Sequence, residues 1–276
     1  MVQKVEDLRA ELGMLGEPDQ MHWSSVHSES MSESGPSEPV TRIRMQRIKC
    51  RVEELREYVD TIWHVALTPL QEISFKPGQY LLVVMSDSDK RPFSIANSPT
   101  RPGVLELQIG ATPENAYAGQ VLARMREQGE IEVELAAGKA FLREESPRPL
   151  ILMAGGTGFS YARSILEYLI DTGSKRPVFF YWGVRQAHWL YELEQMQQWA
   201  SDYVPLTFIP VVQEPESDWT GKSGLVHKAI MDDFVSLHDY DIYVAGRFEM
   251  AGAAREEFKI LGAEPERIFG DAYEFI

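Results

Sequence analysis

The pattern of apolar and polar positions divides the chain into two parts with different periodicities. Between Met45 and Arg143, short runs rich in β-branched and aromatic residues are separated by turn residues such as Pro-Gly and Asp-Ser-Asp. The runs are MQRIKCRV, TIWHVALTP, QYLLVVMS, RPFSIANS, GVLELQIG and EIEVELAA. Six short strands at this spacing predict a small, closed antiparallel barrel. One helical segment, AYAGQVLARMREQ, interrupts the strands and is expected to end at Gly129.

After Pro147 the rhythm changes, and continuous apolar runs alternate with helical periodicity. The runs LILMA, VFFYWG, LTFIPVV and DIYVAG are each followed by a helical pattern, at 161–170, 189–200, 225–231 and 248–261. Buried strands that alternate with helices predict a parallel, doubly wound sheet with helices on both faces. The expected architecture is therefore a β-barrel domain over 45–146, followed by an α/β domain over 147–276.

The first 44 residues differ from both parts. The stretch Ser24–Pro39 consists mostly of Ser, Glu and Pro and offers too little apolar surface to offset the entropy of ordering its backbone. We therefore expect residues 1–44 to form a disordered extension. Val5, Leu8, Leu12 and Leu15 recur at a spacing of three or four and could form a short amphipathic helix. Such a helix either docks on a partner or forms only transiently in the tail.

Composition and charge exclude several classes of function. A net charge of −15 over 276 residues argues against nucleic acid or an anionic membrane as a partner. With Cys50 as its single cysteine, the chain can form neither an internal disulfide nor a cysteine-ligated cluster. The six histidines lack the spacing of metal ligands, so no metal site is expected. The chain also lacks a long apolar run and a signal-peptide pattern, which makes the cytoplasm the expected location.

The segment ILMAGGTGFSYARS follows the first strand of the parallel part and has two interpretations. Gly155–Gly158 stand where a doubly wound sheet binds a dinucleotide, at a strand end that leads into a helix. The loop does not contain the full Gly-x-Gly-x-x-Gly pattern, since Ala162 only approximates the third glycine. The remote alternative is a serine hydrolase that uses Ser160 as its nucleophile, although Ser160 falls within the expected helix.

A second glycine-containing stretch, TGKSG, resembles a P-loop only superficially. Glu216 occupies the position that a P-loop reserves for its first glycine, so the stretch contains no Walker motif. Lys222 either meets a phosphate from its loop or is simply solvated.

The stretch RPFS in the barrel half is the second informative motif. Arg91 offers a planar fork of donors for a phosphate or a ring carbonyl, and Ser94 offers one hydroxyl. Taken together and in this order, RPFS, GQYLLVVM, LILMAGGTGFSYARSIL, FFYWGVR, DIYVAGRFEM and FGDAYEFI resemble the bacterial NAD(P)H:flavin oxidoreductases, or flavin reductases, of the ferredoxin–NADP reductase superfamily. The resemblance extends from about Cys50 to Ile276.

This resemblance implies a flavin-binding barrel, a nicotinamide-binding α/β domain, and a site between them. The flavin contacts that it implies are Tyr80, Arg91, Pro92, Phe93, Ser94 and Phe275. Ser94 is the implied catalytic residue, with its hydroxyl toward flavin N5, and Tyr273 competes with Phe275 as the aromatic that covers the flavin. The implied contacts of the nicotinamide nucleotide are Gly155, Gly156, Thr157, Gly158, Phe159, Arg185, Gly246 and Arg247. Ala245 stands where many members of the superfamily have a cysteine.

The resemblance implies hydride transfer from NADH or NADPH to free FMN, FAD or riboflavin. The reduced flavin would then pass electrons to oxygen, ferric iron or a partner enzyme such as a flavin-dependent oxygenase. Superfamily members that retain FAD use a Gly-x-x-Ser loop, whereas this chain has NAYAGQVL. That difference favours a flavin that enters and leaves as a substrate. The alternative is a reductase that holds FAD tightly and passes electrons to a protein.

Overall fold

The barrel part of the computed structural model is a single antiparallel sheet. The structure describes residues 45–113 and 115–276, so the expected extension 1–44 and its helix lie outside the described residues. The strands are β1 (Gln46–Val59), β2 (Ile62–Pro69), β3 (Tyr80–Val84), β4 (Lys90–Ser94), β5 (Leu105–Gly110) and β6 (Glu130–Ala137). They lie in the order β4-β3-β6-β1-β2-β5, and the Ala96 N–H joins the two ends by donating to the Glu106 carbonyl at 2.8 Å. The predicted six-stranded barrel is confirmed.

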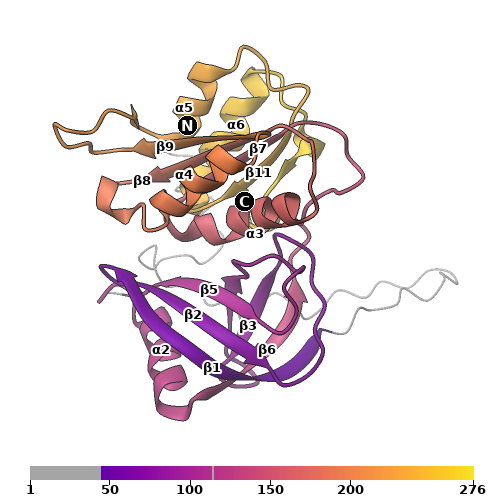
Figure 1. Cartoon of the computed structure of the whole chain (residues 1–276), viewed down its shortest axis with the longest axis vertical. Coiled ribbons are helices and arrows are strands. Elements are labelled where there is room, and N and C mark those ends of the chain that lie inside the picture. The colour runs from indigo at the N-terminus through magenta and orange to yellow at the C-terminus, as the bar shows by residue number, and fades with distance from the viewer. Residues whose placement is uncertain (1–44, 114) are drawn as a thin grey trace, which may run out of the picture.

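The predicted helix of the barrel is α2 (Ala116–Gln128). It buries Ala118, Val121, Leu122 and Met125, which share one helix face, in the same apolar cluster as the barrel strands. The Asn115 side chain caps the first turn by accepting the Ala118 N–H at 3.2 Å, and the helix ends at Gly129. The connection between β5 and β6 thus seals one end of the barrel (Figure 1).

The second part of the chain contains a parallel sheet with helices on both faces. Its strands are β7 (Leu150–Gly155), β8 (Val178–Val184), β9 (Leu206–Val212), β10 (Lys222–Ser223), β11 (Asp241–Ala245) and β12 (Ile268–Phe269), in the order β10-β9-β8-β7-β11-β12. Its helices are α3 (Phe159–Asp171), α4 (Leu193–Asp202), α5 (Val226–Asp233) and α6 (Phe248–Ile260). Separate apolar clusters fill the two faces of the sheet, so the predicted doubly wound architecture is confirmed.

The sequence pattern predicted the start of one helix imprecisely and did not predict two short strands. The helix expected over 189–200 begins only at Leu193, because Leu190 leaves the helical region and ends a short 3₁₀ turn, Ala187–Trp189. The strands β10 and β12 were not predicted, since two residues carry no detectable periodicity. The domain boundaries at 45–146 and 147–276 stay a prediction.

Helix α3 lies between the sheet and the barrel (Figure 1). Ten of its 13 residues are buried, including the polar residues Ser160, Arg163, Ser164 and Glu167. One face of α3 packs in the apolar cluster that covers β7 and β8. Its polar residues form hydrogen bonds with the barrel instead of with water, so this helix connects the two parts of the molecule.

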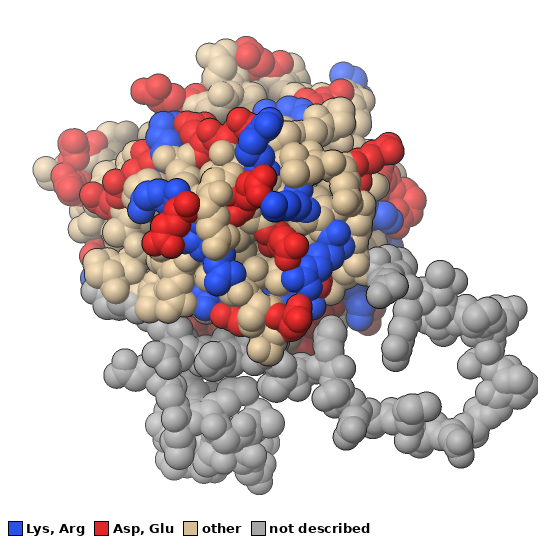
Figure 2. Space-filling model, turned by 90° about the horizontal axis from the view of Figure 1, so that it is seen from below, with Lys and Arg blue, Asp and Glu red and all other residues tan. Residues whose placement is uncertain are grey.

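Charged residues of both signs are interspersed on the barrel end of the molecule (Figure 2). Several of them form ion pairs across neighbouring strands, such as Lys49 with Glu130 and Arg47 with Glu132. The net negative charge therefore does not gather into one acidic patch on this face. No helix among the described residues is long and apolar enough to cross a membrane.

We expect the ion pair between Arg176 and the buried Asp241 to be essential for stability. Asp241 is fully buried, and its carboxylate meets Arg176 at 2.9 Å and Arg267 at 3.3 Å. Arg176→Met leaves that carboxylate undercompensated and should lower the free energy of unfolding in urea by about 3 kcal/mol. Arg185→Met removes the exposed pair with Glu214 and should cost less than about 1 kcal/mol. Equal losses of unfolding free energy in the two variants would contradict a special role of the Arg176–Asp241 pair in stability.

Candidate functional site

The glycine loop lies at the point where the strand order of the parallel sheet reverses, between β7 and β11. A short 3₁₀ turn, Gly156–Gly158, joins β7 to α3. A Cβ atom at Gly158 would lie 2.5 Å from the Ala245 carbonyl oxygen at the end of β11. Only glycine permits this approach of the two backbones. The loop has the position and the close backbone packing that a dinucleotide site in such a sheet requires.

Aromatic residues hold the glycine loop in one conformation. The Trp182 indole N–H donates to the Gly156 carbonyl at 3.0 Å, and the Phe159 ring stacks on Trp182 with 3.9 Å between ring centroids. Thr157 lies against Gly110 at the end of β5, so the loop also contacts the barrel. Since the Phe159 ring is fully buried, this residue can meet a ligand only through its backbone.

The strand that carries RPFS presents its last residues at the rim of the barrel. Ser94 pairs with Tyr80 across β4 and β3, and Pro92, Phe93 and Ser94 are half-buried. Among the described residues, none forms a hydrogen bond with the Ser94 hydroxyl. Burial, with the nearby carboxylates of Asp271 and Glu274, raises the pKa of the Tyr80 phenol to about 12. An aromatic edge with one unsatisfied hydroxyl fits a flat ring system with hydrogen-bonding nitrogens, such as a flavin.

Arg91 is held by protein groups. Its guanidinium donates to both Asp89 carboxylate oxygens at 2.9 and 2.7 Å, to the Tyr117 carbonyl at 2.5 Å and to the Gln120 side chain at 2.7 Å. It also lies over the Tyr117 ring, and the residue is only 7% exposed. Most N–H donors of the Arg91 guanidinium, which the sequence suggested for a ligand phosphate, therefore already have acceptors within the protein.

The residues expected near the rest of the nicotinamide nucleotide lie at the carboxyl ends of the strands. Gly246 and Arg247 follow β11, and Arg247 is exposed without an ion pair to any described residue. Arg185 follows β8 and pairs with Glu214 at 2.9 Å, which stands just beyond β9. Lys222 pairs with Asp233 at 2.6 Å, so its ammonium group already has a protein partner.

The two aromatic candidates at the C-terminus have different surroundings. The Tyr273 hydroxyl donates to the Ala251 carbonyl of α6 at 3.1 Å, and Arg255 covers its ring. Phe275 is 42% exposed and meets the Phe248 ring edge-on. These contacts turn Tyr273 toward α6 and leave Phe275 as the more accessible ring.

Sequence reasoning missed Asp271, which reaches the barrel from the C-terminal 3₁₀ turn Asp271–Glu274. A Cβ atom at Gly138, where φ is +93°, would lie 2.9 Å from the Asp271 carboxylate and 3.0 Å from the Tyr80 ring. One carboxylate oxygen of Asp271 is buried without a hydrogen-bond partner in the described part of the chain. Burial, together with Glu274, raises the pKa of Asp271 to about 7. The only signal in the sequence was its place within FGDAYEFI.

Ser160 lies in the first turn of α3 and is 2% exposed. Its hydroxyl donates to the Gln108 side chain of the barrel at 2.9 Å, and no histidine in the described part of the chain forms a hydrogen bond with it. A hydrolytic nucleophile must be accessible and activated by a base, so this geometry does not support the hydrolase alternative.

Comparison with known proteins identifies the family. A model of the oxidoreductase NAD-binding domain matches residues 152–256. The NAD(P)H-flavin reductase of Vibrio harveyi is 48% identical over 235 residues, which cover 83% of this chain and 99% of the relative. The NAD(P)H-flavin reductase of Aliivibrio fischeri is 47% identical with the same coverage. The chain belongs to the NAD(P)H-flavin reductase family. The resemblance inferred from the motifs is thereby confirmed.

Solved structures share the fold of this flavin reductase family member. The cytochrome P450 reductase GcoB of Amycolatopsis has a TM-score of 0.75 at 24% identity, covering 82% of this chain and 69% of its own. A ferredoxin NADP+ reductase from Neisseria gonorrhoeae with bound FAD and NADP has a TM-score of 0.70 at 17% identity, covering 81% and 97%. Both contain the same arrangement of a barrel followed by an α/β part.

Asp271 should make the stability of the folded protein depend on pH. Its pKa of about 7 lies above the value near 3.9 of an unfolded chain, so the folded state binds the extra proton between these values. Stability from this residue is therefore present below about pH 4 and is lost as pH rises through 7. Asp271→Asn should reduce the loss of unfolding free energy between pH 5 and pH 8, by at most about 3 kcal/mol.

Urea unfolding at the two pH values measures this difference. The exposed substitution Asp239→Asn serves as the control and should retain the wild-type pH dependence. If Asp271→Asn showed the wild-type pH dependence as well, the Asp271 carboxyl would not be the titrating group.

Proposed function

We propose that this chain catalyses hydride transfer from NADH or NADPH to a free flavin, which is FMN, FAD or riboflavin. The observation that carries the proposal is that α3, which follows the glycine loop, packs on the barrel close to the end of the RPFS strand. The glycine loop leads directly into α3, and α3 contacts the barrel backbone at residues 96–98, immediately after the strand that ends at Ser94. Its relatives at 47–48% identity are named NAD(P)H-flavin reductases.

The protein contributes binding and orientation in this proposal, and the flavin supplies the redox chemistry. Tyr80, Pro92 and Phe93 form the edge against which the flavin ring lies. Ser94 donates its unsatisfied hydroxyl to flavin N5, and Phe275 covers the ring. Hydride transfer requires no acid or nucleophile from the chain, so positioning and fixed dipoles carry the catalysis.

The nicotinamide nucleotide binds at the carboxyl edge of the parallel sheet. Backbone groups of residues 155–159 hold the nicotinamide end, and Gly246 lets the neighbouring loop approach it. Arg247 is the exposed cation for a phosphate at the start of α6. Arg185 meets the adenosine ribose or its 2′-phosphate after separating from Glu214.

The surroundings of Arg91 and α2 favour a flavin that binds and leaves as a substrate. A tightly held FAD needs groups for its pyrophosphate, and a helix N-terminus or a free arginine would serve. Here Asn115 caps α2 with its own side chain, and Arg91 is occupied by Asp89, Tyr117 and Gln120. The isoalloxazine ring therefore contributes most of the binding. The reduced flavin leaves and passes electrons to oxygen, ferric iron or a flavin-dependent oxygenase in the cytoplasm.

Oxidation of NADH and NADPH, followed by their absorbance with and without added riboflavin, FMN or FAD, tests the proposal. We expect a nearly colourless purified protein whose activity depends on the added flavin. A yellow protein that reduces a protein acceptor without added flavin would support a tightly bound FAD instead. Absence of flavin-dependent oxidation would refute the proposed function.

Ser94→Ala should lower the single-turnover rate of hydride transfer about tenfold or more, because it removes the donor aimed at flavin N5. Folding should be little affected, since no described residue depends on this hydroxyl. Stopped-flow mixing of NADH with the flavin-loaded protein measures the rate. Ser88→Ala, in the exposed turn before β4, is the control and should keep the wild-type rate. An unchanged rate in Ser94→Ala would remove Ser94 from the catalytic site.

A further inference from the structure

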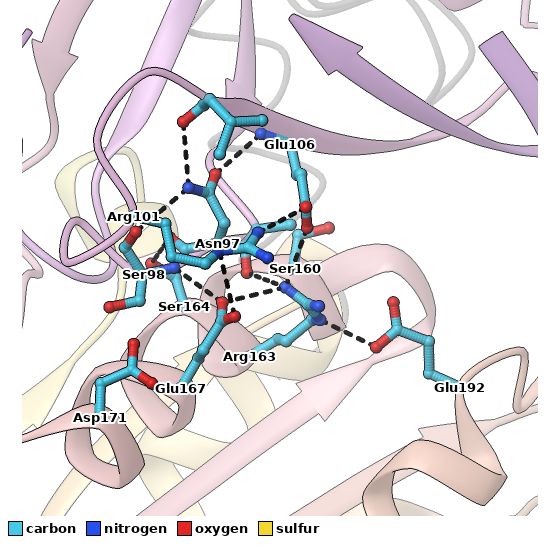
Figure 3. A network of polar contacts seen from close by, with 12 residues as sticks. Asn97, Ser98, Arg101, Glu106, Ser160, Arg163, Ser164, Glu167, Asp171 and Glu192 are labelled. Carbon is cyan, nitrogen blue, oxygen red and sulfur yellow. Dashed lines mark hydrogen bonds and ion pairs between the residues drawn. The ribbon is translucent and has the colours of Figure 1, made fainter. Parts of the chain in front are cut away.

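One face of α3 contacts three consecutive backbone groups of the barrel. The Arg163 guanidinium donates to the Ala96 carbonyl at 2.8 Å, and the Ser164 hydroxyl donates to the Asn97 carbonyl at 2.8 Å. The Ser98 N–H donates in turn to the Glu167 carboxylate at 2.8 Å. Figure 3 shows these side chains of α3 reaching the segment around Asn97 and Ser98 from the helix side. The helix therefore follows this stretch of barrel backbone residue by residue.

Gln108 of β5 forms a second anchor on the same helix. Its side-chain oxygen accepts the Ser160 hydroxyl at 2.9 Å and the Tyr191 hydroxyl at 3.0 Å. Its amide group donates to Glu192 at 2.6 Å, and Glu192 accepts from Arg163 Nε at 2.8 Å. Gln108, Ser160, Arg163 and Glu192 are each at most 9% exposed. Both the oxygen and the nitrogen of the Gln108 side chain thus form hydrogen bonds with residues of the α/β part.

The ion pairs of Arg163 oppose any displacement of α3 relative to the barrel. Arg163 lies 3.3 Å from Glu106 in the barrel, 3.3 Å from Glu167 in α3 and 2.8 Å from Glu192. Arg101 of the barrel bridges Glu106 and Glu167 as a second cation (Figure 3). A buried guanidinium that lost one of these partners would leave uncompensated charge in the interface. The two parts of the molecule therefore have one strongly preferred alignment.

The contacts lie next to both functional segments. Ser94, the last residue of β4, precedes Ala96 by two residues, and Phe159 after the glycine loop directly precedes Ser160. A slip of α3 along the barrel would therefore change the separation between the glycine loop and the flavin strand. Hydride transfer depends on this separation, because the reacting atoms must approach to about 3–3.5 Å.

We propose that the buried contact of α3 with residues 96–98 and Gln108, centred on Arg163, is a positioning device that sets the distance between nicotinamide and flavin. Arg163 is the positioning residue and touches neither substrate. The inference rests on the proposed function and adds to it the part of the protein that aligns the two substrates. A loose contact would leave both binding sites intact but would misalign the reacting atoms.

The test compares Arg163→Lys with Arg176→Lys. The Arg163 and Arg176 side chains are only 10% and 12% exposed, and each donates to a carboxylate and to backbone carbonyl oxygen. Arg176, however, meets Asp241, Arg143 and Arg148 within and just before the parallel sheet. Lysine keeps the charge at either position and loses the planar fork. Both variants should therefore lose thermal stability, while only Arg163→Lys disturbs the alignment.

We expect Arg163→Lys to lower the single-turnover hydride-transfer rate about tenfold or more, with dissociation constants for NADH and riboflavin changed less than about threefold. The primary deuterium isotope effect with C4-deuterated NADH should rise toward its intrinsic value. The long-wavelength charge-transfer absorbance of the stacked nicotinamide and flavin, a readout independent of turnover, should weaken. Arg176→Lys should keep the wild-type rate within about twofold.

Ser160→Ala removes one hydroxyl from the contact and should fold even if Arg163→Lys does not. It should shift the rate and the charge-transfer absorbance in the same direction by a smaller factor. A wild-type rate in folded Arg163→Lys and Ser160→Ala would overturn the positioning role, as would equal rate losses in Arg163→Lys and Arg176→Lys. An inactive wild-type protein would instead refute the proposed function itself.

Discussion

The burial of the Arg163 guanidinium between helix and barrel is the constraint on which the arrangement of the two parts depends. A charge removed from water requires several well-aligned partners, and here these come from Ala96 and Glu106 in the barrel and from Glu167 and Glu192 across the boundary. Apolar packing alone would tolerate sliding between the two parts. The directional hydrogen bonds of the guanidinium do not.

This rigid alignment contrasts with the openness of the flavin side. At the rim of the barrel, the Ser94 hydroxyl forms no hydrogen bond with any described residue. Arg91 and the α2 N-terminus, which are the groups suited to bind a pyrophosphate, already have protein partners. A rigid contact between the two parts together with a weakly binding site suits an enzyme whose two substrates must meet in one geometry and then separate. In the proposed enzyme, affinity comes from few contacts and orientation comes from the scaffold.

The C-terminal turn contributes a second link between the parts. Asp271 leaves the parallel sheet and rests against Tyr80 and Gly138 of the barrel, where its carboxyl is buried. The same turn leads to Phe275 near the end of the chain. The last residues of the α/β part thus reach the Tyr80 side of the barrel, and a group with a pKa of about 7 lies where they meet.

The sequence alone determined the barrel, the doubly wound sheet, the family and the positions of both motifs, because periodicity and motifs are local properties of the chain. It did not reveal that Arg91 is occupied, that Asp271 is buried, or that α3 aligns the two parts. Arg163 and Ala96 are 67 residues apart, and Gln108 and Glu192 are 84 apart. Only tertiary structure decided these contacts, because the partner of a buried polar group is set by which distant segments pack together.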